Sequence, residues 1–267
     1  MAIVTVSREL AALGDETAQE IAKFLGYRLI DKDTLEKRIQ SYGGKAAKFK
    51  KYDERKPSFF AALSQDRDEY LHYLRKAILA EAEHENCVLI GRGANIILKD
   101  VPALISLFVS ARPEVRAERV KSHFRCDERR AWQIIERSDR DRIGFHRYFF
   151  DIDWKYPGHY HLSFNTGIFS PRDCAEIVSS LKDRVFTRGA EAQNVAIMKN
   201  ISLEHEIRHR ILYEHEIPIR SLEISVSGNI VTLHGSTNSQ ALLDATVNLA
   251  REVAGRATVQ SEIQIFR

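Results

Sequence analysis

The stretch that decides the fold is AIVTVSRELAALGDETAQEIAKFLG, which spans residues 2–26. It opens with a short apolar run that is typical of a buried parallel strand, and apolar residues at helical spacing then lead to Gly26, a common helix stop. The loop between them, residues 7–15, therefore lies at the carboxyl end of a strand and the amino end of a helix. In an open α/β sheet, backbone N–H groups and the helix dipole converge there, and such loops bind phosphate.

The same alternation of strand and helix continues to residue 186. Apolar runs predict four further strands, at residues 27–30, 87–90, 104–110 and 162–165. Helical spacing and start signals predict helices at residues 33–40, 69–83, 132–150 and 171–186, with one more beginning at Pro113. Strands that alternate with helices predict an α/β fold with a mostly parallel sheet covered on both faces.

The pattern changes in the last third of the chain. Residues 188–200 have no strong periodicity and are expected to form a linker. Residues 201–267 predict a helix, a hairpin that turns at Gly228, a second helix capped by Ser236 and stopped by Gly255, and a final alternating strand. We therefore expect a domain over residues 1–187, a linker over 188–200, and a small α+β module of α-β-β-α-β order over 201–267.

Composition limits the classes of function. Hydrophobic residues make up 44% and charged residues 29% of the chain, as in soluble globular proteins, and the net charge of +3 gives no reason to expect nucleic acid as a partner. The lysine-rich residues 41–58 are expected to form an exposed face or a mobile lobe. No secretory signal and no apolar run of ~18 residues is apparent, and three scattered cysteines favour reduced thiols. We expect a cytoplasmic protein.

The loop after the first strand departs from the phosphate-binding motif G-x-x-x-x-G-K-[ST]. In that motif the lysine reaches the β- and γ-phosphates and the hydroxyl holds Mg²⁺. Here Asp15 and Glu16 stand where a lysine belongs; these carboxylates suit a helix N-terminus but repel a triphosphate. Taken alone, this loop is more simply interpreted as a structural loop than as a phosphate-binding one. The candidate phosphate-loop residues, in this degenerate form, are Ser7, Arg8, Gly14 and Thr17.

Two other patterns could indicate a functional site, but each has a simpler structural interpretation. Arg137 and Asp141 lie four residues apart on one helix face; a surface ion pair is the default, although arginine is also well suited to gripping phosphate. The sequence from His205 to His209 fits the zinc motif HExxH. We prefer a surface helix there, with both histidines roughly opposite a buried face at Leu203, Ile207 and Ile211, and we expect no metal site.

Several motifs, in order, resemble the cytidylate-kinase-like family of the nucleoside monophosphate kinase superfamily, which has the P-loop fold. They are VTVSRE (4–9), YDERKPSFF (52–60), CVLIGRGANIIL (87–98), RSDRD (137–141), DIDW (151–154) and FNTG (164–167). The resemblance covers roughly residues 1–185. It implies a five-stranded parallel sheet with helices on both faces, a mobile lobe near residues 41–70 and an arginine-bearing lid near residues 116–130.

The resemblance also implies roles for individual residues. Arg92 and Arg137 would grip the acceptor monophosphate and Asp141 would help to orient its sugar, so Arg137 and Asp141 are the expected catalytic residues. The whole implied acceptor site is Gly91, Arg92, Arg137, Arg140 and Asp141, and the implied lid residues are Arg119, Lys121 and Arg125. A further arginine of cytidylate kinases falls on Gly144, and the Gly-Ser-Gly-Gly loop of relatives is replaced by residues 11–14, Ala-Ala-Leu-Gly.

The carboxy-terminal module resembles a BON domain in residues 224–235 (ISVSGNIVTLHG), Gly255 and the last strand. Such domains are associated with phospholipid surfaces and protein assembly. Three functions therefore stay open. The first is phosphoryl transfer from ATP, with Mg²⁺, to a CMP-like nucleoside monophosphate. The second is a degenerate kinase that senses a nucleotide, and the third is BON-mediated assembly or membrane adaptation.

The expected partners follow from these alternatives. The first is a nucleotide. The BON-like module would add a second copy of the chain or another protein, with a membrane surface less strongly supported. No nucleic acid is expected.

Overall fold

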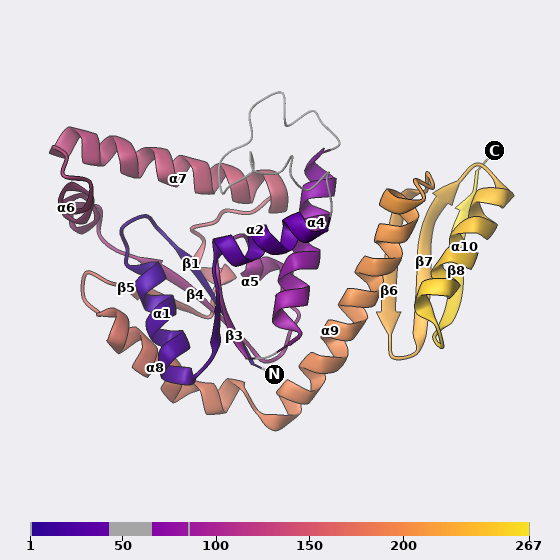
Figure 1. The fold of residues 1–267 in the computed structure, drawn as a ribbon, viewed down its shortest axis with the longest axis horizontal. Helices are drawn as coiled ribbons and strands as arrows, with labels where there is room; N and C mark the ends of the chain where they lie inside the picture. The colour runs from indigo at the N-terminus through magenta and orange to yellow at the C-terminus, as the bar shows by residue number, and fades with distance from the viewer. Residues whose placement is uncertain (1, 43–65, 85, 267) are drawn as a thin grey trace. The chain divides into compact units, whose positions relative to one another are not determined.

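The computed structural model describes residues 2–42, 66–84 and 86–266. The chain divides by its contacts into two compact units, residues 1–194 and 195–267, and each is described by itself (Figure 1). The motif YDERKPSFF and most of the lobe expected over residues 41–70 fall outside the described residues.

The first unit is built on a five-stranded, all-parallel sheet of order β2-β3-β1-β4-β5. Its strands are β1 (Ile3–Arg8), β2 (Arg28–Ile30), β3 (Cys87–Ile90), β4 (Leu104–Ser110) and β5 (Leu162–Asn165). The chain builds β2 and β3 on one side of β1 and then crosses to β4 and β5 on the other. The loop after β1 therefore lies at the point where the strand order reverses, which is where open α/β sheets bind ligands.

Helices cover both faces of this sheet (Figure 1). On one face, α1 (Gly14–Leu25) and α8 (Pro171–Val185) bury the apolar side chains of β1, β3 and β4. On the other lie α4 (Asp66–Ala82) and α5 (Ala94–Ile97). The unit is completed by α2 (Lys32–Ser41), α6 (Pro113–Phe124), α7 (Glu128–Phe150) and the short 3-10 helix η2 (Pro157–His159). The predicted fold class is confirmed.

The second unit contains a three-stranded sheet of order β6-β7-β8. Strands β6 (Arg220–Ser227) and β7 (Ile230–Thr237) form the antiparallel hairpin predicted at Gly228, and β8 (Thr258–Ile265) pairs with β7 in parallel. Helix α10 (Gln240–Ala254) ends at Gly255 as predicted, but its N-cap is Ser239. The expected cap, Ser236, lies in β7, because the strand continues four residues beyond Leu233, where its apolar alternation ends.

The stretch expected to be a linker is helical. Residues 188–200 form the first part of α9 (Arg188–His209), which is followed by the π-helical turn η3 (Arg210–Glu214). No sequence signal indicated this helix because it is polar and weakly periodic, and a buried polar residue holds its first part against the sheet. The division between the two units, after residue 194, nevertheless falls within the predicted linker. Asn194 is fully buried; its Oδ1 accepts from the Ala103 N–H (2.8 Å) and its Nδ2 donates to the Ala103 carbonyl (3.4 Å).

The HExxH motif lies on α9, as a helix was predicted there. Ile207 and Ile211 are fully buried, which confirms the expected apolar face, but His205 is only 9% exposed, so it does not face solvent as we had expected. Within the described residues there is no group of three or more His, Cys, Asp or Glu side chains that could hold a metal ion. Within the same residues no helix is both long enough and apolar enough to cross a membrane.

The burial of Asn194 leads to a test of where the first unit ends. In the variant Asn194→Ala, the Ala103 N–H loses its acceptor inside the protein, so we expect a loss of about 1–3 kcal/mol in the free energy of unfolding, measured by denaturant titration of the full chain. Asn200→Ala, on the same helix, is the matched control and should be close to neutral. Equal stabilities for both variants would contradict the assignment of the first part of α9 to the amino-terminal unit.

Candidate functional site

The loop after β1 is held by side chains that donate hydrogen bonds to four successive carbonyl groups. The donors come from α6, from the turn after β5 and from α1. The pairs are Arg116 with Leu10 (2.8 Å), Arg119 with Ala11 (3.0 Å), Thr166 with Ala12 (2.7 Å) and Thr17 with Leu13 (2.6 Å). Because the carbonyl side of these peptide groups is bound by the protein, their N–H side is directed away from these donors.

The loop keeps the backbone shape of a glycine-rich loop without its glycines. Ala11 and Leu13 have φ values of 58° and 56°, in the left-handed region that costs a residue with a side chain roughly 1–2 kcal/mol. Turns that contain left-handed residues can direct N–H groups toward one concave side, which is an anion-binding arrangement. The N–H of Ala12 is already bonded to the Glu9 carbonyl (3.3 Å). Leu13 is also the N-cap of α1 and offers no side-chain cap, so the first N–H groups of that helix add to the same arrangement.

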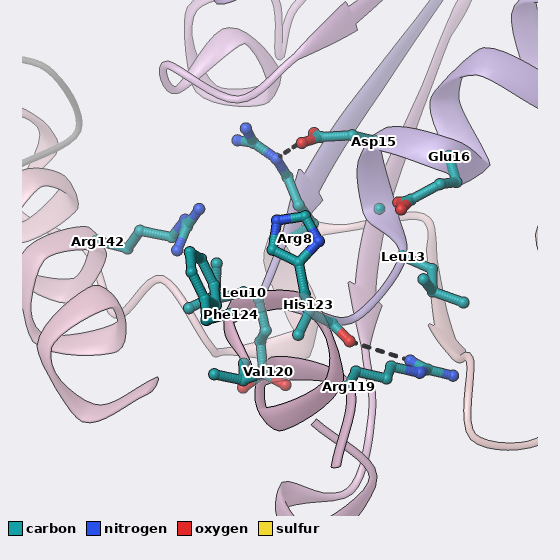
Figure 2. Close-up of a pocket in the computed structure, with 13 residues that line it drawn as sticks. Arg8, Leu10, Leu13, Asp15, Glu16, Arg119, Val120, His123, Phe124 and Arg142 are labelled. Atoms are coloured by element: carbon teal, nitrogen blue, oxygen red, sulfur yellow. Dashed lines mark hydrogen bonds and ion pairs between the residues drawn. The ribbon is translucent and has the colours of Figure 1, made fainter. Parts of the chain in front are cut away.

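A pocket of about 300 Å³ opens over this loop (Figure 2). It is lined by the loop, by the first turn of α1, by the end of α6 and by Arg142 of α7. Three arginines, Arg8, Arg119 and Arg142, contribute to its wall, and so do the acidic residues Glu9, Asp15 and Glu16. The pocket therefore combines an anion-binding backbone with side-chain charges of both signs.

Arg8 and Asp15 bind each other at this pocket. The Arg8 Nε–H donates to Asp15 Oδ1 at 2.9 Å, and Figure 2 shows the pair beside the first turn of α1. The side chain of Arg8 reaches this position by passing over Gly14, where a Cβ would lie 2.2 Å from Arg8 Cβ. The guanidinium of Arg8 is thus bound by an acidic residue at the amino end of α1.

The other two predicted loop residues are turned away from the pocket. Ser7 is 3% exposed within β1, and Thr17 is fully buried with its hydroxyl bonded to the Leu13 carbonyl. Neither lines the pocket. A Mg²⁺-binding hydroxyl in the Thr17 position would therefore require that bond to change.

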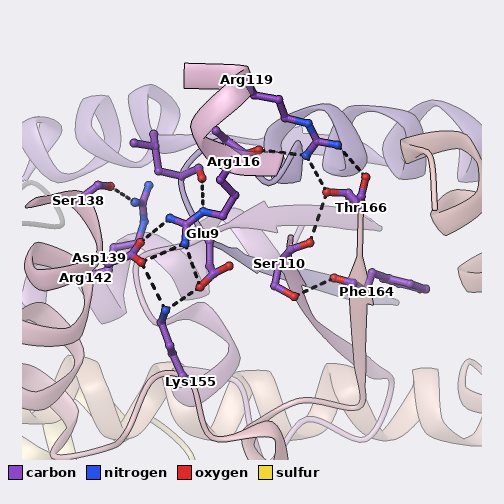
Figure 3. Close-up of polar contacts among 12 residues, drawn as sticks. Glu9, Ser110, Arg116, Arg119, Ser138, Asp139, Arg142, Lys155, Phe164 and Thr166 are labelled. Carbon is purple, nitrogen blue, oxygen red and sulfur yellow. Dashed lines mark hydrogen bonds and ion pairs between the residues drawn. The ribbon is translucent and has the colours of Figure 1, made fainter. Parts of the chain in front are cut away.

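Behind the loop lies a network of charged side chains (Figure 3). Arg116 is 3% exposed and binds both carboxylate oxygens of Asp139, at 2.7 and 3.0 Å, with Glu9 at 3.3 Å. Lys155 contacts Glu9 at 2.6 Å and Asp139 at 3.4 Å. Two acidic and two basic groups therefore compensate one another while joining β1, α6, α7 and the segment after α7.

The network sets the charge of its own members. Burial alone would raise the pKa of Asp139, but the hydrogen bonds and charge of Arg116, together with Lys155, outweigh it and hold that pKa below its usual range. Burial acts to lower the pKa of Lys155, and the contacts with Glu9 and Asp139 reverse this and raise it. Both groups are therefore kept in their charged forms.

The residues predicted for catalysis lie on other faces of α7. Arg137 is exposed, and Arg140 is exposed and paired with Glu136 at 3.6 Å. The expected pair between Arg137 and Asp141 does not form among the described residues. Their catalytic roles stay predictions that this arrangement does not test.

Arg92, in the turn between β3 and α5, lies near the carboxyl end of α7. It is 2% exposed and donates to the hydroxyl of Tyr70 (2.8 Å) and to Glu36 (2.7 Å), and the ring of Tyr70 packs on Phe149. Since a helix rises about 1.5 Å per residue, Arg137 lies roughly 18 Å along α7 from Phe149. The structure thus brings Gly91 and Arg92 to α2 and α4, not to Arg137.

The expected lid residues have separate positions. Arg119 donates to the Ala11 carbonyl and to Thr166, so it is part of the loop's support, and burial lowers its pKa. Lys121 forms a surface pair with Glu118. Arg125 ends α6 in a left-handed conformation (φ 49°). The stretch 116–130 is thus the end of α6, a turn and the start of α7.

Sequence reasoning missed Arg116, Asp139, Lys155 and Thr166. One signal was available for Asp139. The buried residues of α7 recur at helical spacing, and that face, extended from Ile135 by one turn, includes Asp139 and not Asp141. A carboxylate in line with an apolar stripe indicates a buried partner.

The charge network predicts the effect of replacing Asp139, and Asp141, two residues away, provides the control. In Asp139→Asn the buried Arg116 keeps only Glu9 as a charged partner, so we expect a loss of about 3 kcal/mol in the free energy of unfolding at pH 7. Asp141→Asn should be within ~0.5 kcal/mol of the wild type.

The pH dependence of that difference has a definite sign. Because the folded pKa of Asp139 is lowered, its contribution is present above the unfolded pKa of ~3.9 and is lost as the pH falls through the folded value. The difference between wild type and Asp139→Asn in denaturant titrations should therefore shrink below about pH 4. A neutral Asp139→Asn variant would contradict the assigned network.

Comparison with known proteins agrees with this architecture. The model of the "Cytidylate kinase-like family" matches residues 3–168, more than half of the chain, and the "BON domain" model matches residues 202–265. A comparison with curated proteins found no match.

Two solved structures are among those that the fold is similar to. A crystal structure of an uncharacterized protein from Eubacterium ventriosum is 19% identical, with 68% of this chain and 99% of that chain covered and a TM-score of 0.55. A shikimate kinase from Bacteroides thetaiotaomicron is 15% identical, with 69% and 98% covered and a TM-score of 0.40. The parallel sheet and the loop after β1 agree with the family match, and the chain belongs to the cytidylate kinase-like family and carries a BON domain.

Proposed function

We propose that the amino-terminal unit binds the phosphate groups of a nucleotide at the loop after β1 and does not transfer a phosphoryl group. One observation carries the proposal. The loop has the backbone shape that binds anions, with left-handed Ala11 and Leu13, while the residue after Gly14 is an aspartate that holds Arg8. This corresponds to a degenerate kinase that senses a nucleotide.

The charges at this loop explain how it could bind phosphate groups without transferring one. Backbone N–H groups and a helix N-terminus stabilise phosphate regardless of which side chains follow. Transfer additionally needs cations fixed on the bridging and γ-phosphate oxygens. Here Asp15 and Glu16 add negative charge at that point, and Arg8 must leave Asp15 before it can reach a phosphate.

The alternative, transfer from ATP with Mg²⁺ to a CMP-like acceptor, requires Arg8, Arg119 or Arg142 to act in place of the lysine. All three already have partners in the protein: Asp15 for Arg8, the Ala11 carbonyl for Arg119 and the Ser138 hydroxyl for Arg142. Of the predicted acceptor residues, Arg137 is exposed on α7, whereas Arg92 is bonded to Tyr70 and Glu36. These contacts favour the sensing function over the catalytic one.

A sensor needs an output, and the BON domain is the part of the chain suited to it. Its role would be to contact a second copy, another protein or a membrane surface according to the nucleotide state of the first unit. In this proposal the first unit binds the nucleotide and the BON domain makes the contact.

The first test measures whether the protein transfers a phosphoryl group from ATP. In a coupled assay of ADP release with CMP, UMP or AMP as acceptor, we expect rates far below the ~1–100 s⁻¹ of kinases, because Asp15 and Glu16 place negative charge where transfer needs a cation. Rates within that range would show that an arginine replaces the lysine and would overturn the sensing proposal.

The second test changes Asp15. Asp15→Asn removes one negative charge from the pocket and weakens the contact with Arg8, so the dissociation constant for ADP or ATP should fall roughly tenfold, which corresponds to about 1.4 kcal/mol. Calorimetric titration of the full chain measures it.

The matched control is Asp183→Asn. It makes the same change in net charge near Tyr27, beyond the carboxyl end of α1, and should leave the affinity unchanged. If Asp15→Asn binds ADP and ATP no better than the wild type, the Arg8–Asp15 pair does not occupy a phosphate site.

A further inference from the structure

The sheet of the second unit has two edge strands, β6 and β8, and the two edges differ in how they are protected (Figure 1). An edge strand presents backbone N–H and C=O groups that can pair with another chain. Folded proteins usually block such edges with bulges, with charged side chains or with a covering element. In this unit the edge at β6 is blocked in these ways and the edge at β8 is not.

The edge at β6 is blocked by side chains of α9 and by an irregular backbone. Oε1 of Glu204 accepts a hydrogen bond from the Val226 N–H (2.7 Å). The guanidinium of Arg208 donates to the Leu222 carbonyl. The register with β7 also shifts at the start of β6, around Ser221 (φ 50°). A further strand could pair with β6 only by displacing these side chains.

The free side of β8 presents the backbone groups of alternate residues. At the two ends of the pairing with β7, the Thr258 N–H donates to the Asn229 carbonyl (2.8 Å) and the Phe266 N–H donates to the Thr237 carbonyl (2.9 Å). Because the hydrogen-bonding direction alternates along a strand, the even-numbered residues of β8 bond to β7 and the odd-numbered ones face the free side. Within the residues that the structure describes, no strand pairs with that side. The residues that face it are Val259, Ser261, Ile263 and Ile265.

The sequence of β8, TVQSEIQI, contains no proline, lysine or arginine that would block an edge. Its register with β7 runs through all eight residues without a bulge. Its single charged residue, Glu262, is contacted by Nδ1 of His234 (3.2 Å). The Ile263 N–H contacts the Ser261 hydroxyl at 3.4 Å, which is too long for a strong hydrogen bond. The strand is therefore regular and open to pairing.

We propose that β8 pairs in antiparallel fashion with β8 of a second copy of this chain, about a two-fold axis at Ser261. Residues directly opposite each other in an antiparallel pair share a face of the sheet, so such an axis passes through a residue. The middle of the strand offers Ser261 or Glu262. An axis at Glu262 would set two carboxylates against each other, whereas an axis at Ser261 sets Glu262 opposite Gln260 of the second copy. Charge therefore selects Ser261.

The same register also matches the other side chains. It sets Val259 opposite Ile263 of the second copy, and Thr258 opposite Gln264. Val259 and Ile263 belong to the apolar core of the second unit, so the cores of the two copies would join at the contact. Two short strands bury little area, and we expect weak, concentration-dependent association. This contact specifies one of the partners that the proposed function allows for the BON domain, and it needs no nucleotide.

The test is sedimentation equilibrium of the full chain without nucleotide, from micromolar to submillimolar concentration, where we expect monomers in equilibrium with dimers. Gln260→Glu puts a carboxylate opposite Glu262 at two symmetric places and should weaken the dimer roughly tenfold. The matched control is Ser225→Glu. Ser225 lies on the same face and in the same row of the sheet, on the blocked strand β6, so the same change in charge should leave the dimer unaffected.

A second substitution tests the register itself. Adding Glu262→Lys to Gln260→Glu sets opposite charges against each other at both places, so the dimer should be restored to at least the wild-type affinity. The restoration also shows that the single variant folds.

Three results would overturn the proposal. They are a wild type that stays monomeric throughout, a dimer that Ser225→Glu weakens as much as Gln260→Glu does, and a double variant that stays as weak as the single one. Because nucleotide is left out, each of these results leaves phosphate binding at the loop after β1 untouched.

Discussion

Four carbonyl groups in a row, those of residues 10–13, accept hydrogen bonds from side chains of three surrounding segments, and the rest of the candidate site depends on this constraint. With the carbonyls bound, the loop can hold Ala11 and Leu13 in a conformation that favours glycine. The buried charge network behind the loop maintains the position of Arg116, the first of the four donors. The loop's shape is therefore set by its surroundings rather than by its own residues.

Because its surroundings set the loop's shape, the loop can keep left-handed residues without having glycine at those positions. A glycine-rich loop adopts left-handed conformations at little cost, whereas here the surrounding donors must offset roughly 1–2 kcal/mol at each of two residues. What changes is the charge at the first turn of α1, where Asp15 binds Arg8. Under the proposed function, anion binding by the backbone would survive such a change, and the positioning of cations for transfer would not.

The fold could be predicted from the sequence because its signals are local. The apolar runs gave β3, β4 and β5 at the residues where the structure has them, and Gly26 and Gly255 mark helix ends. The charge network could not be predicted in the same way. Its members are up to 146 residues apart, and pairing depends on which face of α7 turns inward, so Asp141 was chosen where Asp139 is buried. The first part of α9 was missed because one buried amide, that of Asn194, holds it.

The central claim is that the backbone of residues 11–16 binds phosphate. The most direct measurement is an NMR titration of the ¹⁵N-labelled full chain with inorganic pyrophosphate, followed at the backbone amides of this loop. Saturable shifts of the amide signals of Leu13, Gly14 and their neighbours, absent when chloride replaces pyrophosphate at equal ionic strength, are the predicted result. Unchanged loop amides at millimolar pyrophosphate would contradict it.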